Sequence, residues 1–161
     1  MLATLLTWLN DKTSSVFVVA TANDVTALPP ELMRKGRFDE QWFVDLPSET
    51  ERQAILEIHL RKRGHPVPAQ LDRAATAATG FVGAELEAVV IEALFTAFDE
   101  GQPLDLGHLL SAINATKPMS CLMKETIDGL RKWAEGRARH ASSRKDAPRE
   151  RVRKLNVAGA N

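Results

Sequence analysis

The sequence has little cysteine, no net charge and no long hydrophobic run. Its single cysteine, Cys121, excludes an internal disulfide framework, and its four scattered histidines provide no zinc-ligand spacing. Lys plus Arg and Asp plus Glu each number 21, so the overall charge gives no argument for nucleic acid as a partner. No apolar run approaches the ~20 residues of a membrane span, and no signal-peptide pattern follows Met1. We therefore expect a soluble, cytoplasmic protein with no metal site and no membrane segment.

What the sequence does contain is the apolar content of an ordinary globular protein, 44%, arranged in two different patterns. In the first, leucines at helical spacing predict an opening helix that ends near Asn10. The continuous β-branched run over 16–22 is typical of a strand buried on both faces of a parallel sheet. A proline pair then predicts a short helix over 31–35, and residues 42–45 predict a second strand.

From residue 48 onward the pattern is helical alone. Ser48 and Glu51 form a capping-box pattern ahead of a helix that extends to about Arg63, and Asp105 is a second candidate cap. Apolar spacing predicts further helices over 69–78, 86–97, 106–113 and 123–133. We therefore divide the chain into an α/β part, a helical part and a tail, over residues 1–47, 48–136 and 137–161.

The tail beyond Gly136 is basic. Between Arg137 and Lys154 it has eight basic residues and two acidic ones, with almost no apolar content, so we expect it to be extended and disordered. It has no interleaved aromatic side chains and would support only a salt-sensitive, sequence-independent contact with nucleic acid. We favour the interpretation of a solvated tail.

The residues with the most chemical information lie in one stretch, 18–47, VVATANDVTALPPELMRKGRFDEQWFVDLP. In an open α/β sheet, ligands bind at the carboxyl ends of the strands, so Asn23 is placed to orient a water or to contact a phosphate. Arg34 and Arg37 follow, and their guanidinium groups suit phosphate oxygens. A turn or a solvated surface explains each residue taken alone, whereas the ordered combination is more specific.

In that order these residues resemble the second region of homology of the AAA+ ATPases, of the classical AAA type. The resemblance covers about residues 1–139 and implies that Asn23 is the sensor 1 residue and that Arg34 and Arg37 are the arginine-finger pair. The segments LPPELMRKGRFDE and MKETIDGLRKWAEGRARHASS are similar to the AAA ATPases of cyanobacteria, algal plastids and other bacteria. The implied fold class is α/β, the C-terminal part of a P-loop NTPase parallel sheet followed by an all-α helical lid.

The resemblance continues into the helical part. ERQAILEIHL places His59 where many AAA members have a histidine near the ribose and base of the nucleotide. TGFVGAELEAVV resembles the lid signature, in which Gly83 and Ala84 are implied to open a helix beside the adenine. Small residues permit close backbone approach, and a helix N-terminus favours an anionic ligand. A solvated helix face for His59 and a plain helix start for the other two are the alternatives.

Two motifs of the family are missing. The phosphate loop G-x-x-x-x-G-K-[ST] does not occur, because no glycine is followed by lysine. Residues 94–100, LFTAFDE, resemble the acidic strand motif, but they continue the apolar spacing of the helix predicted over 86–97, and we interpret them as helical. The resemblance implies that both motifs precede Met1. We therefore expect the C-terminal half of a longer ATPase, or the product of a truncated reading frame, and in either case a chain that is inactive alone.

The resemblance also implies ligands and partners. ATP is the implied cofactor, with Mg²⁺ and the phosphates bound mainly by the missing half. Neighbouring subunits would form a homo-oligomeric ring, a hexamer, that remodels a protein or complex. The alternative is a non-catalytic interaction module that binds a protein partner through its helices and basic tail. An upstream reading frame with a phosphate loop would favour the ATPase.

Overall fold

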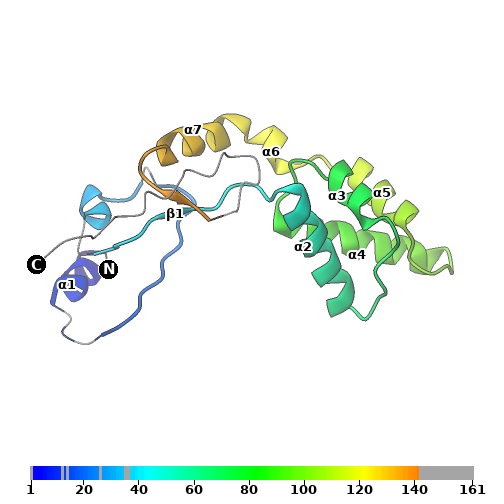
Figure 1. Ribbon diagram of the computed structural model, residues 1–161, viewed down its shortest axis with the longest axis horizontal. Coiled ribbons are helices and arrows are strands. Elements are labelled where there is room, and N and C mark those ends of the chain that lie inside the picture. The colour runs from blue at the N-terminus through cyan, green and yellow to red at the C-terminus, as the bar shows by residue number, and fades with distance from the viewer. Residues whose placement is uncertain (1, 12, 14, 26, 35–36, 142–161) are drawn as a thin grey trace, which may run out of the picture.

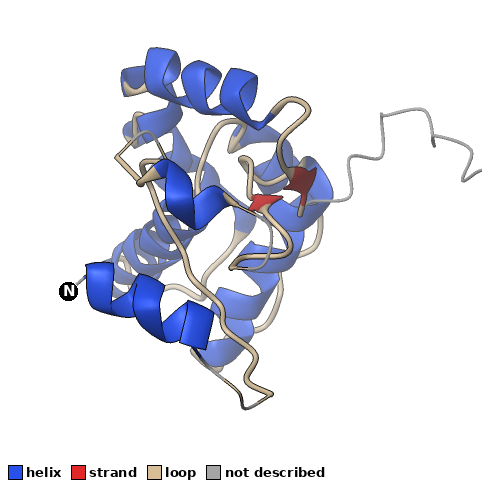
Figure 2. Ribbon diagram, turned by 90° about the vertical axis from the view of Figure 1, so that its left-hand side faces the viewer, coloured by secondary structure: helices blue, strands red, loops and turns tan. Residues whose placement is uncertain are grey.

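The structure is a computed structural model that describes residues 2–141 except 12, 14, 26, 35 and 36. The molecule is elongated (Figure 1): helices α2 to α5 form one end, helix α1 lies near the other, and α6 and α7 lie between them. Helices predominate, and the two strands are short (Figure 2). Among the residues that the structure describes, no helix combines the length and the apolar character that crossing a membrane requires.

The main core of the described residues lies in the bundle formed by helices α2 to α5. These are α2 (Glu49–Lys62), α3 (Leu71–Ala77), α4 (Gly83–Asp99) and α5 (Leu106–Ala115). Helices α2 and α5 each pack against α3 and α4. Buried side chains recur on α4 at the spacing of one helix face, at Leu86, Val89, Val90 and Ala93. The predicted helices of this part are confirmed.

Three predicted details of these helices are also confirmed. Ser48 Oγ accepts the N–H of Glu51 at 3.4 Å, and Glu51 Oε2 accepts the N–H of Ser48 at 2.8 Å, so the capping box is formed. Asp105 Oδ1 accepts the N–H of His108 at 3.0 Å and caps α5. Helix α4 continues without a break to Asp99, so 94–99 are helical and do not form the acidic strand of the family.

Arg52 is a charged side chain inside the bundle, only 6% exposed. Its Nε donates to the carbonyl oxygen of Ala75 at 2.8 Å, and its Nη1 donates to that of Pro47 at 2.8 Å. Its Nη2 lies 3.4 Å from Thr79 Oγ1. Burial lowers the pKa of Arg52, and the charge of nearby Glu49 opposes this shift. The side chain thereby joins the start of α2 to the end of α3.

The N-terminal part departs from the sequence prediction. Helix α1 (Leu2–Asp11) confirms the opening helix, and the 3-10 helix η1 (Pro30–Met33) replaces the helix predicted over 31–35, whose last residue lies outside the described part. The strand predicted over 16–22 is not formed in this chain: neither strand of the structure pairs with this segment, and Phe17 is 93% exposed. An apolar strand is stable only when neighbouring strands pair with its edges and other elements cover its faces.

The two strands of the structure come from distant parts of the chain. Helices α6 (Met119–Leu122) and α7 (Lys124–Ala134) lead back from the bundle to β2 (Arg139–His140). Strand β2 pairs in parallel with β1 (Trp42–Phe43), which is shorter than the predicted strand over 42–45.

This pairing corrects the prediction that the chain is disordered from residue 137, because residues 139–140 form an ordered strand. Ring contacts support the pair: the Arg139 guanidinium lies 5.9 Å from the centre of the Trp42 ring, and His140 meets Phe43 edge to face at 5.8 Å. These are contacts between side chains on two distant segments, which the composition of the tail did not indicate. The rest of the predicted tail, 142–161, lies outside the described residues.

We expect amide hydrogen exchange to separate the two ends of the molecule. Residues 86–94 lie within α4 and contribute to the bundle core, so their amides should be strongly protected. Residues 16–22 form no regular secondary structure and should show almost no protection. Exchange of the 161-residue chain, followed residue by residue, checks this; equal protection of both segments would show a self-sufficient sheet and contradict the prediction.

Candidate functional site

A hollow of about 580 Å³ lies where β1, α2, α4 and α7 meet. Most of its lining is apolar, and its volume is within the range of small-molecule sites, about 300–1,000 Å³. The hollow is lined by Phe43, Val44, Asp45, Leu46, Pro47, Glu51, Ala54, Ile55, Val82, Gly83, Ile127 and Leu130. Of the six residues singled out from the sequence, this lining includes Gly83.

Gly83 is the first residue of α4. A Cβ atom added to it would meet no heavy atom within 4 Å, so the chain leaves open space beside this backbone. The helix is 17 residues long, and the free N–H groups of its first turn give this end a partial positive charge. The neighbouring Ala84 is exposed and is not among the residues that line the hollow. The open backbone at Gly83 can therefore be approached closely by a flat or anionic group.

Glu85 holds this turn in place, a role that the sequence interpretation missed. One carboxylate oxygen accepts the N–H of Val82 at 2.8 Å, and the other accepts the N–H of Met119, at the start of α6, at 2.6 Å. The first bond is the second half of a capping box without its usual Ser, Thr or Asp partner, so the usual pattern gave no signal. The second bond joins two segments far apart in sequence.

His59 lies in a charged cluster between α2 and α4. Its Nδ1 is 3.4 Å from Glu87 Oε1, and Arg63 Nη2 donates to the same oxygen at 2.8 Å. The hydrogen bond from Arg63 is the main cause that lowers the pKa of Glu87, with the charge of His59 acting in the same direction. His59 is not among the residues that line the hollow. Its described contacts therefore explain it as part of the packing between two helices.

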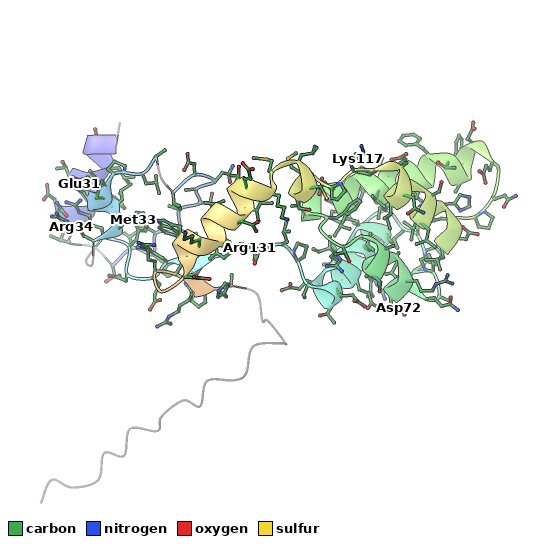
Figure 3. All side chains as sticks on the ribbon, turned by 90° about the horizontal axis from the view of Figure 1, so that it is seen from above. Glu31, Met33, Arg34, Asp72, Lys117 and Arg131 are labelled. Carbon is green, nitrogen blue, oxygen red and sulfur yellow. The ribbon has the colours of Figure 1, made fainter. Side chains whose placement is uncertain are left out.

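Arg34 lies at the end of η1, on the side of the molecule opposite the bundle (Figure 3), and Arg37 is bonded to Glu31 of the same helix. Arg37 donates from Nε to Asn10 Oδ1 at 3.2 Å and from Nη1 to the carbonyl oxygen of Glu31 at 2.8 Å. Arg34 is exposed, and among the described residues no side-chain partner of its guanidinium is seen. The structure therefore keeps this pair apart from the hollow.

Asn23 is exposed, in the irregular segment that follows residues 16–22. The sequence prediction places it at the carboxyl end of a strand, but the strand is not formed, so the structure does not bring Asn23 to a sheet edge. Among the described residues no group of three or more His, Cys, Asp or Glu could hold a metal ion.

Comparisons with known proteins identify relatives of this chain. Residues 1–46 match the family "ATPase family associated with various cellular activities (AAA)". The chain is 42% identical over 142 residues to the "Uncharacterized AAA domain-containing protein ycf46" of Pyropia yezoensis, an alignment that covers 86% of this chain and 29% of the relative. It is also 39% identical over 107 residues to "ATP-dependent zinc metalloprotease FtsH 2" of Sphaerobacter thermophilus, covering 66% of this chain and 16% of that protein. The chain thus spans less than a third of the length of these relatives.

A solved structure shows the same fold. The AAA domain of FIGL-1, determined in complex with ADP, matches with a TM-score of 0.55 at 16% identity, over 63% of this chain and 39% of that one. The matched family, the named relatives and the shared fold agree with one another. The chain belongs to the AAA ATPase family: it is mostly helical with a small parallel sheet, as expected for the C-terminal part of an AAA domain that contains the helical lid.

Proposed function

We propose that this chain is the sensor and lid part of an ATP-hydrolysing AAA module that works as a ring of identical subunits. ATP would lie between the lid and an upstream half of the module, which supplies the phosphate loop and most of the ligands of Mg²⁺. Within this proposal the chain divides into a sheet part at 1–47, the lid at 48–136 and a basic tail at 137–161. The work performed would be the remodelling of a protein or complex.

The observation that carries the proposal is the hollow beside Gly83. Its apolar lining and its volume of about 580 Å³ suit a nucleotide base, and the N-terminus of α4 favours the anionic part of the same ligand. In this proposal Gly83 and Ala84 permit close approach of the backbone to the adenine, and His59 lies near the ribose. The open space at the Gly83 Cβ position supports this role.

The arginine residues would act on a different nucleotide. Arg34 lies at the end of the molecule opposite the bundle (Figure 3), and neither arginine lines the hollow, which suits residues that reach the γ-phosphate bound by a neighbouring subunit. Arginine fingers elsewhere increase the rate about 10³–10⁵-fold. At 1.36 kcal/mol per factor of ten, this is a stabilisation of the transition state by roughly 4–7 kcal/mol. Asn23 would orient the attacking water once a complete sheet positions it.

The comparisons favour this function over the alternative of a non-catalytic module that binds a partner through the lid and tail. Each named relative is an AAA protein or an ATP-dependent enzyme. The cytoplasmic location, the hexameric ring and the remodelling of a protein or complex remain predictions.

Alone, the 161-residue chain is expected to hydrolyse no ATP and to bind it weakly at best. The reason is that the sequence contains no phosphate loop to hold the phosphates and Mg²⁺. Phosphate release with ATP and Mg²⁺ checks this against a buffer blank. Magnesium-dependent turnover above the blank that disappears in Arg37→Ala would contradict it.

The complementary experiment tests the function itself. Joined to an upstream half that carries a phosphate loop, the chain should support Mg²⁺-dependent ATP hydrolysis. No turnover in a folded, nucleotide-bound and assembled module would reject the ATPase function and favour the interaction module.

A further inference from the structure

In the described part of the chain, hydrogen bonds attach the segment from α6 to β2 to the other elements at three separate places. At its start, the N–H of Met119 donates to Glu85 on the bundle. At its end, the N–H groups of Arg139 and Ala141 donate to the carbonyl oxygens of Gln41 and Phe43, each at 2.9 Å. The third attachment lies between these, where Arg131 of α7 contacts Asp45. The segment therefore bridges the bundle and the end of the molecule that contains β1 (Figure 3).

The middle attachment is a bidentate ion pair between Arg131 and Asp45. Arg131 Nη2 donates to Asp45 Oδ1 at 2.8 Å, and Arg131 Nε lies 3.0 and 3.1 Å from the two carboxylate oxygens. The Asp45 side chain is only 12% exposed, so solvent screens the pair less than an open surface pair. The hydrogen bond to Asp45 is the main cause that raises the pKa of Arg131. Because the planar guanidinium binds the carboxylate through two nitrogens, the contact fixes both the orientation of α7 and its distance from Asp45.

Asp45 occupies the short linker between β1 and α2. Strand β1 ends at Phe43, and α2 begins after its cap at Ser48. Within the linker, Asp45 Oδ1 also accepts the N–H of Leu46 at 2.7 Å. A group that holds Asp45 therefore restrains the linker through which the chain passes from the strand to the bundle.

Helix α7 is also a wall of the hollow. Ile127 and Leu130 line it from α7, together with residues of the linker, of α2 and of the start of α4. Leu130 directly precedes Arg131, and Ile127 lies one helical turn before Arg131 on the same side of the helix. A movement of α7 away from Asp45 would carry this wall away from Gly83.

We propose that Asp45 and Arg131 form a latch that holds α7 across the linker and sets the width of the hollow. With the latch closed, the end of the molecule that contains β1 and the bundle keep one relative orientation. With the latch open, α7 separates from the linker, β2 separates from β1, and the hollow widens on the side lined by α7. The latch itself follows from contacts within this chain, and only its consequence for a bound nucleotide rests on the proposed function.

Amide hydrogen exchange of the 161-residue chain without nucleotide tests the latch. In Arg131→Gln and in Asp45→Asn, the amides of Arg139 and Ala141 should exchange at least about tenfold faster, because β2 then detaches from β1 more often. The amides of 86–93 in the bundle core should not change. Lys132→Gln is the matched control, since it removes one positive charge from the exposed side of the same helix.

The double variant Arg131→Gln/Asp45→Asn completes the test. If the two residues stabilise the pairing of β1 and β2 only through their contact with each other, the amides of Arg139 and Ala141 should exchange no faster in the double variant than in either single variant. Additive effects, an equal effect of Lys132→Gln, unchanged exchange in either single variant, or a parallel increase in the bundle core would each overturn the latch. Because the measurement contains no nucleotide, a failure of the ATPase proposal leaves its result unaffected.

Discussion

Alanine at Arg34 or at Arg37 should lower ATP turnover by at least about tenfold while nucleotide affinity stays within a few-fold. The expectation applies to a module that joins this chain to the phosphate-loop half. The reason is that a finger residue acts on the transition state formed in the neighbouring subunit and not on nucleotide binding in its own. The exposed Arg34 is free to reach outward, whereas Arg37 must first leave Asn10 and the Glu31 carbonyl.

A mixing experiment identifies action between subunits. Subunits with Arg34→Ala and an intact phosphate loop, mixed with subunits that have intact arginines and a disabled phosphate loop, should recover turnover. Arg73→Ala is the control, since Arg73 is an exposed arginine of the bundle whose side chain donates a hydrogen bond to Gln70 on the surface. A large loss of affinity with unchanged turnover would instead place the arginines in the pocket of their own subunit.

The largest expected loss of stability follows from Arg52→Met. This substitution keeps much of the side-chain volume but removes the donors to the carbonyl oxygens of Ala75 and Pro47. A buried acceptor left without a partner costs about 1–3 kcal/mol. The bond to Ala75 is buried and the bond to Pro47 is half-buried, so the second loss is smaller and the free energy of unfolding should fall by roughly 2–4 kcal/mol. The difference in the free energy of unfolding between Arg52→Met and the unmodified chain should be the same at low and high salt, because the partners of Arg52 are neutral carbonyl oxygens.

Urea unfolding of the 161-residue chain, followed by far-ultraviolet circular dichroism, measures this effect. Arg61→Met on the same helix is the matched control, because its ion pair with Glu57 is exposed and should contribute less than about 1 kcal/mol. Equal losses in the two variants would show that Arg52 has no special role in joining α2 to α3.

The parts of the fold that could be predicted from the sequence are those fixed by nearby residues. The cap at Ser48, the cap at Asp105 and the continuous helix α4 depend on neighbours a few positions away. The segment 16–22 has the composition of a buried strand. Such a strand forms only when other strands pair with its edges, and neither strand of the structure pairs with this segment. Strand β2 could not be foreseen, because two polar residues in a basic stretch are stabilised by the side chains of a distant strand.

The same distinction applies to the site. Gly83 was identified from a local signature, and the structure places it on the hollow. The ion pair between Asp45 and Arg131 joins residues 86 positions apart and has no local pattern, and neither does the bond from Met119 to Glu85. The roles of Asn23, Arg34, Arg37, His59 and Ala84 come from family resemblance and remain predictions, since they depend on a bound nucleotide and neighbouring subunits.

The parallel pairing of β1 with β2 also has a consequence for the order of folding. Closing a loop between distant segments has an entropic cost that grows with loop length, whereas the helices of the bundle meet their partners over short sequence separations. The bundle is therefore expected to form first and, by folding the intervening residues into a compact unit, to shorten the effective loop between Trp42 and Arg139. Strand pairing and the Asp45–Arg131 contact would then complete folding. The same segment, last to form, would be the first to separate when the protein unfolds.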